Sequence, residues 1–548
     1  MKRATRSALF CLILILGTIL VATCGPESEP PYDLIIANGQ ILDGTGSPSL
    51  SADVGVRDGK IAKIGDLAGS DAAKVIDAEG LIVSPGFIDL HNHSDEELIS
   101  TPKADTYIRQ GVTTLFVGQC GGSAAPSDEY PTFASYLATL DEKGMALNAA
   151  ALVGHGNIRQ LVVGGDDRAP TPAELEEMKA MVAAAMDEGA YGLSTGLVYF
   201  PGMYAKTDEI VELAKVVAAR GGIYATHVRD DGARWEEAIV EAIEIARQSG
   251  VQLQIAHNES HYPNWGKIGP IMQHIHDARA EGLRVGVDVI PATAGGQGID
   301  TAFPNWALEG GDAKLIERLK DPVQRARIVA YIKDIGQHTS PLPSLIADGY
   351  GDKIFIEGRS LADIAEERNQ NLIDAAIDLV IERNRTYSVV QESHFEDDIR
   401  LEVADPIMAI GSDGSIRTFG EGTPNPRSYT TFPLIFRKYV RGETRPEEPR
   451  EVGKTILSMQ DAVRKLTSLP AQTLGLEDRG LIREGYWADI TIFDPTTISD
   501  MGTYADPHQY PKGIPYVIVN GEVVIENSEH TGALPGAVLR GPGTVAKM

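Results

Sequence analysis

The sequence is poor in cysteine, with three among 548 residues. Two of them, Cys11 and Cys24, fall within the first 24 residues, so that Cys120 alone remains for the body of the chain. A single internal cysteine excludes an intrachain disulfide framework. Cys120 therefore needs another explanation, and inert packing or metal binding are the two alternatives.

Basic residues are also scarce, since 49 Lys and Arg stand against 77 Asp and Glu and give a net charge of −28. Nucleic-acid binding needs clustered Lys and Arg, so this imbalance argues against a nucleic-acid partner. It neither selects nor excludes a small anionic substrate, because the field in a binding site is local. Hydrophobic content of 43% and charged content of 23% are typical of a globular protein.

Long apolar runs are missing except over residues 9–22, which follow three basic residues. This pattern predicts a signal peptide over 1–24, because the run is too short for a comfortable membrane span. Val21–Cys24 resembles a bacterial lipobox, in which Cys24 would be lipidated; a plain secretory signal or an N-terminal anchor are the alternatives. We expect export to the bacterial cell envelope or periplasm, a tether over 25–31, and membrane contact only through the lipid anchor.

Short β patterns occur at both ends of the rest of the chain. Residues 32–84 contain apolar runs before Asn38-Gly39 and Asp58-Gly59, dipeptides that supply the positive φ angles of two-residue hairpins. The same pattern of short apolar runs before turn dipeptides returns over 479–548, for example before Asn520-Gly521. We predict one small β-sandwich domain built from both chain ends, followed by a C-terminal tail.

The middle of the chain, 85–478, alternates strands with helices. Thr171-Pro172-Ala173-Glu174 is a capping box with proline at the first helical position, and Gly189 ends that helix. The alternation predicts an α/β fold with eight parallel strands closed into a (β/α)8 TIM barrel. An insertion at about 291–406 is expected to form a lid or subdomain. The predicted strands are Phe87–Leu90, Thr113–Val117, Leu147–Val153, Tyr191–Val198, Ile223–Val228, Leu253–His257, Val285–Ile290 and Ile407–Ile410.

Candidate metal ligands and acid/base groups stand where these strands end, and the active sites of such barrels lie at the carboxyl ends of the strands. Residues two apart in a strand point the same way, so His91 and His93 project together. Each candidate alone is more often structural, but their convergence on one mouth predicts a metal centre. Imidazole and thiolate together suit zinc. The candidates are His91, His93, Cys120, His227, His257 and Asp413.

Seven short motifs run along the chain: Gly86–His93, Gly111–Thr114, Gly154–Asn157, Gly192–Tyr199, Asn264–Lys267, Gly411–Gly414 and Ala488–Ile490. Together they resemble the amidohydrolase superfamily and, more narrowly, the N-acyl-D-amino-acid deacylase (D-aminoacylase) family. The resemblance covers about residues 32–527. In that family a cysteine after the second strand takes the place that a carbamylated lysine holds elsewhere, and Cys120 fits this position.

The resemblance also implies a role for each candidate ligand and for the carboxylate. Zinc lowers the pKa of a bound water from about 15.7 to around 7, and a nearby carboxylate can then relay the proton to the leaving amine. The implied roles are a tight zinc on Cys120, His227 and His257, a weaker second site on His91 and His93 with Cys120 shared, and Asp413 as the general acid and base.

Three further residues match positions that contact the substrate in that family. Arg427 matches the arginine that binds the substrate carboxylate, and a surface arginine is the alternative. Tyr199 and His155 match motif positions near the site, where a packing role is the alternative. The small-molecule amide substrate would therefore be contacted by Arg427, Tyr199 and His155.

The sequence departs from the family pattern at other substrate positions. Asn258-Glu259 stands where His-Lys commonly follows the strand-six histidine, and Ile290 and Gly296 replace a tyrosine and a serine. The replaced residues are expected to face the substrate carboxylate. A carboxylate in place of a lysine reverses the local charge and disfavours an anionic group there.

We therefore expect a zinc-dependent hydrolase of a linear amide, chiefly an N-acyl-D-amino acid or a related D-configured amide or peptide. Cyclic amide hydrolysis of the hydantoinase or dihydroorotase kind is a second hypothesis, which the absence of lysine from 191–199 disfavours. A non-catalytic envelope lipoprotein that binds a metal or solute is a third. Such a binder would have no need of Asp413 as an acid/base group.

Overall fold

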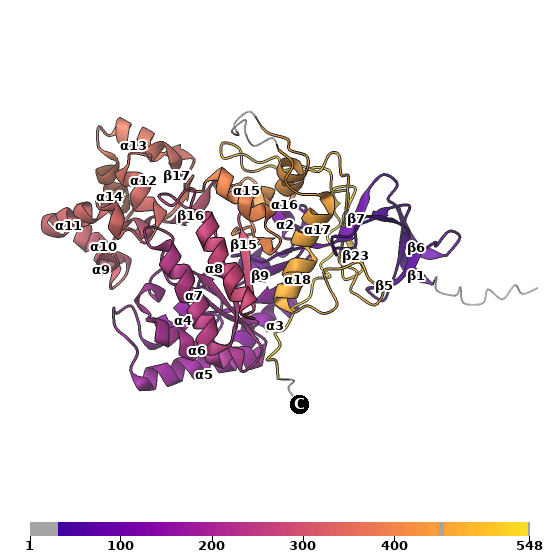
Figure 1. Cartoon of the computed structure of the whole chain (residues 1–548), viewed down its shortest axis with the longest axis horizontal. Coiled ribbons are helices and arrows are strands. Elements are labelled where there is room, and N and C mark those ends of the chain that lie inside the picture. Colours follow the sequence, from indigo (N-terminus) through magenta and orange to yellow (C-terminus); the bar gives the residue numbers. More distant parts are fainter. Residues whose placement is uncertain (1–30, 446–447, 449–453, 546–548) are drawn as a thin grey trace, which may run out of the picture.

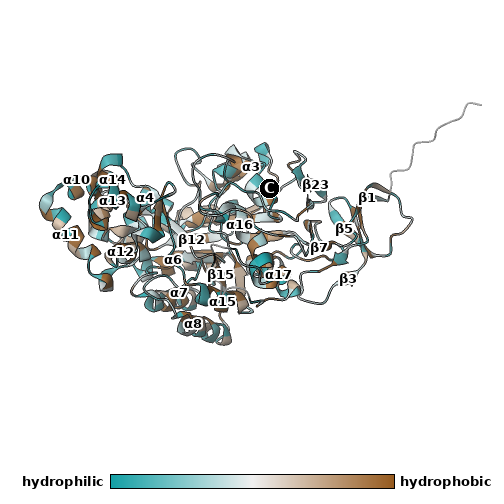
Figure 2. Cartoon of the chain, turned by 90° about the horizontal axis from the view of Figure 1, so that it is seen from above, coloured by the Kyte–Doolittle hydropathy of each residue, from teal (hydrophilic) through white to brown (hydrophobic). Residues whose placement is uncertain are grey.

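The structure is a computed structural model that describes residues 31–445, 448 and 454–545. A β domain, a central barrel and a helical insertion follow one another along the long axis (Figure 1). The view from above preserves this order (Figure 2). The predicted signal peptide and, apart from Pro31, the predicted tether lie outside the described residues. Within the described residues, no helix is both long and apolar enough to cross a membrane.

The predicted (β/α)8 barrel is confirmed, and all eight predicted strands are present. Neighbouring strands pair in parallel, and β10 and β11 together form the third strand position. A parallel bridge between Asn92 and Gly414 brings the last strand against the first. The strands are β8 (Phe87–Asp89), β9 (Val112–Val117), β10 (Asn148–Ala151), β11 (Val153–Gly154), β12 (Gly192–Gly196), β13 (Ile223–His227), β14 (Gln252–Ile255), β15 (Val285–Val289) and β20 (Met408–Ile410).

Helices pack around the barrel, and their starts and ends follow local sequence signals. The Thr171 hydroxyl accepts a hydrogen bond from the Glu174 amide at 3.3 Å, and the Glu174 carboxylate accepts one from the Thr171 amide at 2.6 Å. This reciprocal cap fixes the start of α5, as the sequence predicted. The main barrel helices are α3 (Phe133–Lys143), α5 (Pro172–Glu188), α6 (Thr207–Ala218), α7 (Trp235–Ser249), α8 (Ile268–Ala280), α17 (Met459–Leu466) and α18 (Ser468–Leu474).

The β domain is a sandwich of two sheets, as predicted. One sheet comes from the N-terminal region, and the other joins both chain ends because β21 pairs antiparallel with β7. Asp58-Gly59 and Asn520-Gly521 have positive φ angles, as two-residue hairpins require. The first sheet contains β1 (Tyr32–Ala37), β4 (Asp53–Arg57), β5 (Lys60–Gly65) and β6 (Ala72–Asp77). The second contains β2 (Gln40–Ile41), β3 (Leu50–Ser51), β7 (Ile82–Pro85), β21 (Ile490–Phe493), β22 (Tyr516–Val519), β23 (Glu522–Glu526) and β24 (Glu529–His530).

The segment between β15 and β20 folds around a core of its own, which includes Leu342, Leu345 and Ile377. This segment contains a four-stranded sheet in the order β16-β19-β17-β18. Its strands are β16 (Gly295–Gly298), β17 (Ile354–Ile356), β18 (Arg359–Ser360) and β19 (Ser388–Gln391). Its helices are α9 (Asn305–Leu308), α10 (Asp312–Lys320), α11 (Pro322–Ile332), α12 (Pro341–Ala347), α13 (Leu361–Glu367) and α14 (Leu372–Arg383). The next helix, α15 (Glu396–Ala404), packs instead on α8, β15 and β20 of the barrel.

Candidate metal centre and active site

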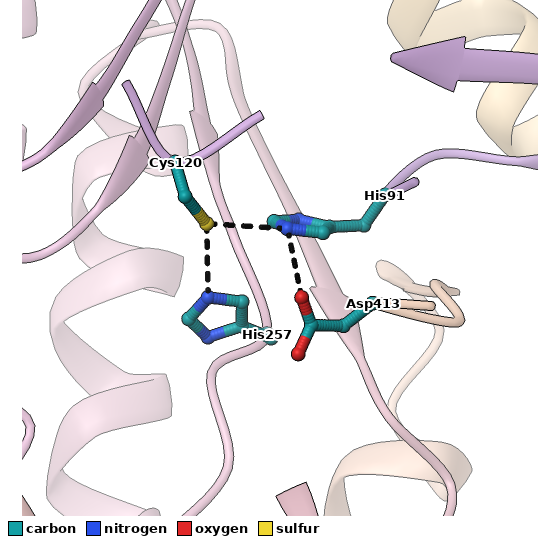
Figure 3. A group of neighbouring side chains, drawn as sticks. All are labelled: His91, Cys120, His257 and Asp413. Carbon is teal, nitrogen blue, oxygen red and sulfur yellow. Dashed lines mark hydrogen bonds and ion pairs between the residues drawn. The ribbon is translucent and has the colours of Figure 1, made fainter. Parts of the chain in front are cut away.

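The candidate ligands converge at the carboxyl end of the barrel (Figure 3). The Cys120 sulfur lies 3.4 Å from His91 Nε2, 3.6 Å from His257 Nε2 and 3.8 Å from His227 Nδ1. Zinc bonds of 2.3 Å to sulfur and 2.0–2.1 Å to nitrogen, set at tetrahedral angles, place the two ligand atoms about 3.6 Å apart. The distance from the thiol to each imidazole therefore fits a pair of ligands on one zinc ion, and His91, Cys120, His257 and Asp413 all offer ligand atoms within 4.8 Å of one another.

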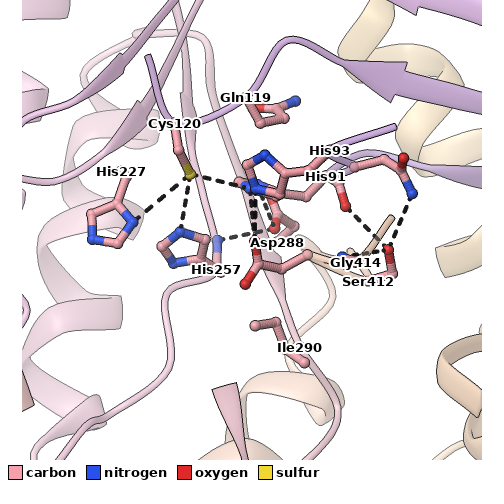
Figure 4. Close-up of polar contacts among 12 residues, drawn as sticks. His91, His93, Gln119, Cys120, His227, His257, Asp288, Ile290, Ser412 and Gly414 are labelled. Atoms are coloured by element: carbon pink, nitrogen blue, oxygen red, sulfur yellow. Dashed lines mark hydrogen bonds and ion pairs between the residues drawn. The ribbon is translucent and has the colours of Figure 1, made fainter. Parts of the chain in front are cut away.

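Asp413 lies next to His91 in this cluster (Figure 3), and Figure 4 adds His93 and His227 to the same group of side chains. The Oδ1 atom of Asp413 is 2.9 Å from His93 Nε2 and 3.4 Å from His91 Nε2. Its other oxygen, Oδ2, forms a 2.7 Å ion pair with Arg427. Burial alone would raise the pKa of Asp413, but Arg427 and the histidines lower this pKa well below its ordinary value. Asp413 is therefore ionised at neutral pH.

Burial sets the protonation of the ligand candidates. It lowers the pKa of His91 well below its ordinary value and that of His257 to about 3, so both imidazoles are neutral and have a lone pair to offer. Burial raises the pKa of the Cys120 thiol well above its ordinary value. A bound cation reverses that effect and deprotonates a coordinating thiol. The donor set thus matches what a metal ion needs.

Three residues of the centre have a left-handed backbone. The φ angles are 53° at Cys120, 33° at His257 and 48° at Asp413. Such a conformation costs a non-glycine residue roughly 1–3 kcal/mol and persists only where the surroundings hold it. The Asp413 amide donates to the His91 carbonyl at 2.9 Å, which fixes one of these turns. Strain concentrated at three neighbouring site residues is typical of a functional centre.

Two buried aspartates that the sequence analysis missed support the histidines. Asp288 accepts a hydrogen bond from the His257 amide at 3.0 Å and lies 3.8 Å from His91 Nδ1. Burial raises its pKa to about 7. Asp231 lies 3.5 Å from His227 Nε2. Carboxylates behind ligating histidines orient the rings. The available signal was Asp288 itself, a carboxylate inside an otherwise apolar strand.

The predicted substrate residues occupy different surroundings. Tyr199 lines the main cavity, and its ring centroid is 4.7 Å from that of His227. Arg427 also lines this cavity and pairs with Asp413. His155 is fully buried and lies 2.9 Å from Glu209, and it is not among the described residues that line the cavity. The substrate roles of all three stay predictions.

The main cavity has a volume of about 650 Å³, which is the size of a small-molecule site. His93, Cys120 and Asp413 form its inner end. The insertion and the segment before α16 (Arg427–Leu434) supply much of the rest of the wall. Those wall residues include Gly296, Gln297, Phe355, Val389, Pro424 and Asn425.

The residues that depart from the family pattern lie together beside the centre. The Glu259 carboxylate is fully buried and accepts a hydrogen bond from the Ile290 amide. Gly296 faces Arg427, since a Cβ at this glycine would lie 3.5 Å from the guanidinium. Burial raises the pKa of Glu259 well above its ordinary value. The residues that depart from the family pattern therefore lie together on one side of the site.

Known proteins resemble this chain over nearly its whole length. The amidohydrolase family model matches residues 74–525. An N-acyl-D-glutamate deacylase of Alcaligenes xylosoxydans xylosoxydans is 32% identical over 535 residues, which cover 94% of this chain and 98% of that protein. A D-aminoacylase from the same organism is 33% identical over 531 residues, with the same coverage of 94% and 98%.

A solved structure agrees with these matches. N-acyl-D-glutamate deacylase from Bordetella bronchiseptica, crystallised with zinc and a phosphonate mimic of the tetrahedral intermediate, superposes with a TM-score of 0.78 at 31% identity. The match covers 94% of this chain and all of the other. The chain therefore belongs to the amidohydrolase family, and within it to the N-acyl-D-amino-acid deacylases, which are metal-dependent hydrolases of carbon–nitrogen bonds other than ordinary peptide bonds.

Proposed function

We propose that this protein uses zinc to hydrolyse the linear amide of an N-acyl-D-amino acid or a related D-configured amide. The observation that carries the proposal is the position of the Cys120 thiol, within 3.4–3.8 Å of three imidazole nitrogens and beside the ionised Asp413. This cluster lies at the inner end of a cavity large enough for a small acylated amino acid. The similarity to a deacylase crystallised with zinc and a phosphonate supports the same chemistry.

Cys120, His227 and His257 would hold the tighter zinc, and His91 and His93 with Cys120 a weaker one. A D-aminoacylase structure described by one-metal activation and second-metal attenuation, 31% identical to this chain, supports two sites of unequal importance. When bound, zinc polarises the amide carbonyl and lowers the pKa of water. Asp288, 3.8 Å from His91 Nδ1, and Asp231, 3.5 Å from His227 Nε2, would orient these rings from behind.

Asp413 would handle the proton. Because its carboxylate is ionised, an oxygen of this group can take a proton from the attacking water. The same oxygen can then pass the proton to the nitrogen of the leaving amine, so one residue serves both halves of the reaction. Its contacts with His91 and His93 keep it at the inner end of the cavity, where the amide must lie.

Arg427 would bind the carboxylate of the substrate. In the substrate-free protein it pairs with Asp413 at 2.7 Å, so an incoming carboxylate would compete with Asp413 for the same guanidinium. Binding would then release Asp413 to act as a base. Tyr199, which lines the cavity, would pack beside the substrate, whereas His155, buried against Glu209, would act only through packing behind the site.

The test is hydrolysis of N-acyl amino acids in both configurations, with neutral, basic and acidic side chains, and of dipeptides, a hydantoin and dihydroorotate. Bound metal is assayed on the same samples. We expect at least one zinc per chain and turnover of D-configured N-acyl substrates in clear preference to their L forms. Arg427→Gln should raise KM for substrates with a free carboxylate and leave KM for their amides unchanged. Zinc without turnover of any N-acyl amino acid would contradict the proposal.

Export and attachment through Cys24 are a separate part of the proposal and rest on the sequence alone. Mass spectrometry of the mature N-terminal peptide tests them. A lipidated Cys24 at the N-terminus is the expected result. A mature chain that begins elsewhere without lipid would contradict the anchor.

A further inference from the structure

A second group of metal-binding side chains lies close to the Cys120 centre. Glu259, His261 and His394 each offer a ligand atom, and these atoms lie within 4.8 Å of one another. All three residues are buried, with exposed fractions of 0%, 6% and 4%. None of them belongs to the set of ligand candidates that the sequence suggested.

The group forms where the barrel meets the insertion. Glu259 and His261 follow β14, whereas His394 follows β19 of the insertion. An antiparallel bridge joins His261 to His394, and the Tyr262 amide donates to the Ser393 carbonyl at 2.9 Å. The Trp265 indole also donates to this carbonyl, at 2.7 Å. These backbone contacts fix the two loops and hold the three ligand atoms within 4.8 Å of one another.

The imidazole of His394 is prepared to bind a cation. Its Nδ1 lies 2.7 Å from the Ala292 carbonyl, which can only accept, so Nδ1 carries the ring hydrogen. In the neutral ring the lone pair is therefore on Nε2. This atom is buried and has no hydrogen-bond partner among the described residues. A carbonyl behind one ring nitrogen and a free lone pair on the other is the usual state of a metal-ligating histidine.

Glu259 presents a free ligand atom in the same way, and His261 places its Nε2 beside it. The Glu259 carboxylate uses Oε1 to accept from the Ile290 amide, and its buried Oε2 has no hydrogen-bond partner among the described residues. His261 uses Nδ1 for a 3.0 Å hydrogen bond with the Ser393 hydroxyl. The nearest acid to its Nε2 is Asp231, at 3.9 Å.

These atoms border a small cavity of about 10 Å³, which is on the order of the space that one water molecule or one ion needs. His227, His257 and Asp413 border the same cavity, so the second group lies next to the catalytic centre and is separate from its thiolate. When Glu259 is ionised, its buried Oε2 and the buried Nε2 lone pair of His394 are both acceptors. A cation satisfies both.

We propose that Glu259, His261 and His394 form a further site for a divalent first-row ion, apart from the two proposed zinc sites that share Cys120. Two imidazoles and one carboxylate are a known zinc donor set, and zinc is the ion that this geometry suits best. The ion neutralises Glu259 and places positive charge on the wall of the reaction cavity. This metal site is formed by these three residues alone, so the proposal does not depend on which amide the enzyme cleaves.

The direct test is a crystal of the zinc-loaded protein measured on both sides of the zinc absorption edge. We expect an anomalous peak at roughly 2.0–2.2 Å from Glu259 Oε2, His261 Nε2 and His394 Nε2, in addition to the density beside Cys120. A peak beside Cys120 with only a water molecule, or nothing, among these three atoms would overturn the proposal.

A solution test uses cobalt as the probe, because only the Cys120 centre contains sulfur. Glu259→Gln keeps the shape of the side chain and should remove one cobalt per chain, while the thiolate-to-cobalt charge-transfer absorption of the Cys120 centre stays unchanged. His394→Gln should do the same. The retained absorption also reports that each variant is folded.

The matched control is His276→Gln, since His276 pairs with Asp405 outside both groups. It should bind as much cobalt as the wild type. Equal cobalt content in the wild type, Glu259→Gln and His394→Gln would overturn this further site. This outcome would leave the proposed amide hydrolysis untouched, because the substrate panel tests that separately.

Discussion

Two walls enclose the reaction cavity, and they are built on different principles. The barrel wall carries its functional side chains directly after strands β8, β9, β13, β14 and β20, whose parallel pairing fixes their positions. The insertion wall presents Gly296, Phe355 and Val389 from a small sheet with a core of its own. This difference suggests a division of labour, in which the barrel holds the chemistry and the insertion shapes the substrate site.

The largest effect should follow from removing the thiol of the barrel wall. Cys120→Ala deletes the atom that contacts three imidazoles, and the fixed strand ends cannot move to replace it. Zinc affinity and turnover should both fall by more than about 10²-fold, the upper end of what a supporting residue contributes. Metal analysis and kinetics on one sample measure this. Unchanged zinc content would exclude Cys120 as a ligand.

A smaller effect should follow from weakening the support of the ligands. Asp288→Asn removes the charge behind His91 and should lower zinc affinity or activity by about 10–100-fold. Asp300→Asn is the control, because Asp300 is a half-buried carboxylate in the insertion whose pKa is also raised by desolvation, to about 6, and its loss should leave zinc affinity unchanged. Zinc titration by competition with a chelator compares the two. Equal losses in both variants would remove the distinction between the walls.

Two core substitutions, one in the barrel and one in the insertion, test the comparison of the two walls through the free energy of unfolding. Leu253 in β14 and Leu345 in α12 are both fully buried, and Leu→Ala at either should cost about 2–5 kcal/mol of unfolding free energy. Only Leu253→Ala should also weaken zinc binding, since β14 leads to His257. Leu345→Ala should instead raise KM. Chemical denaturation, zinc titration and kinetics test the pair, and zinc loss in Leu345→Ala would contradict the division of labour.

The smallest effect concerns a buried lysine that supports the barrel wall. Lys465 in α17 donates to the carbonyls of Asp405 and Met408, and burial lowers its pKa from 10.5 to about 7. Between these two values the unfolded chain binds more protons than the folded one, so this group makes stability rise as pH increases from 7 to 10.5. Lys465→Met should flatten that rise in denaturation curves. An identical pH profile in both proteins would contradict this assignment.

The barrel wall could be predicted from the sequence because its residues follow periodic strands. The alternation of strands and helices fixed where each strand ends, and the candidates His91, Cys120 and His257 lie at those ends. The supporting Asp288 escaped prediction, because a single acid in an apolar strand does not reveal its partner. Which residue a buried acid contacts depends on the tertiary structure and not on the neighbouring sequence.

The insertion wall could not be predicted in the same way. Strand β16 has the sequence Gly-Gly-Gln-Gly, which has no strand propensity, and it forms only because it pairs with β19. His394 contacts His261 through an isolated antiparallel bridge just after β19, so nothing in the spacing of the two residues indicates the contact. The ion pair between Arg427 and Asp413 was also missed, because the sequence predicted one role for each residue and no contact between them.

The most direct test of the account is the Asp413→Asn variant, assayed for bound zinc and for turnover of an N-acyl-D-amino acid on one preparation. Asparagine keeps the shape of the side chain but cannot carry a proton between water and the leaving amine. The account predicts unchanged zinc content at the Cys120 centre and a fall in turnover of about 10²–10⁴-fold. Turnover equal to that of the wild type at equal zinc content would contradict it.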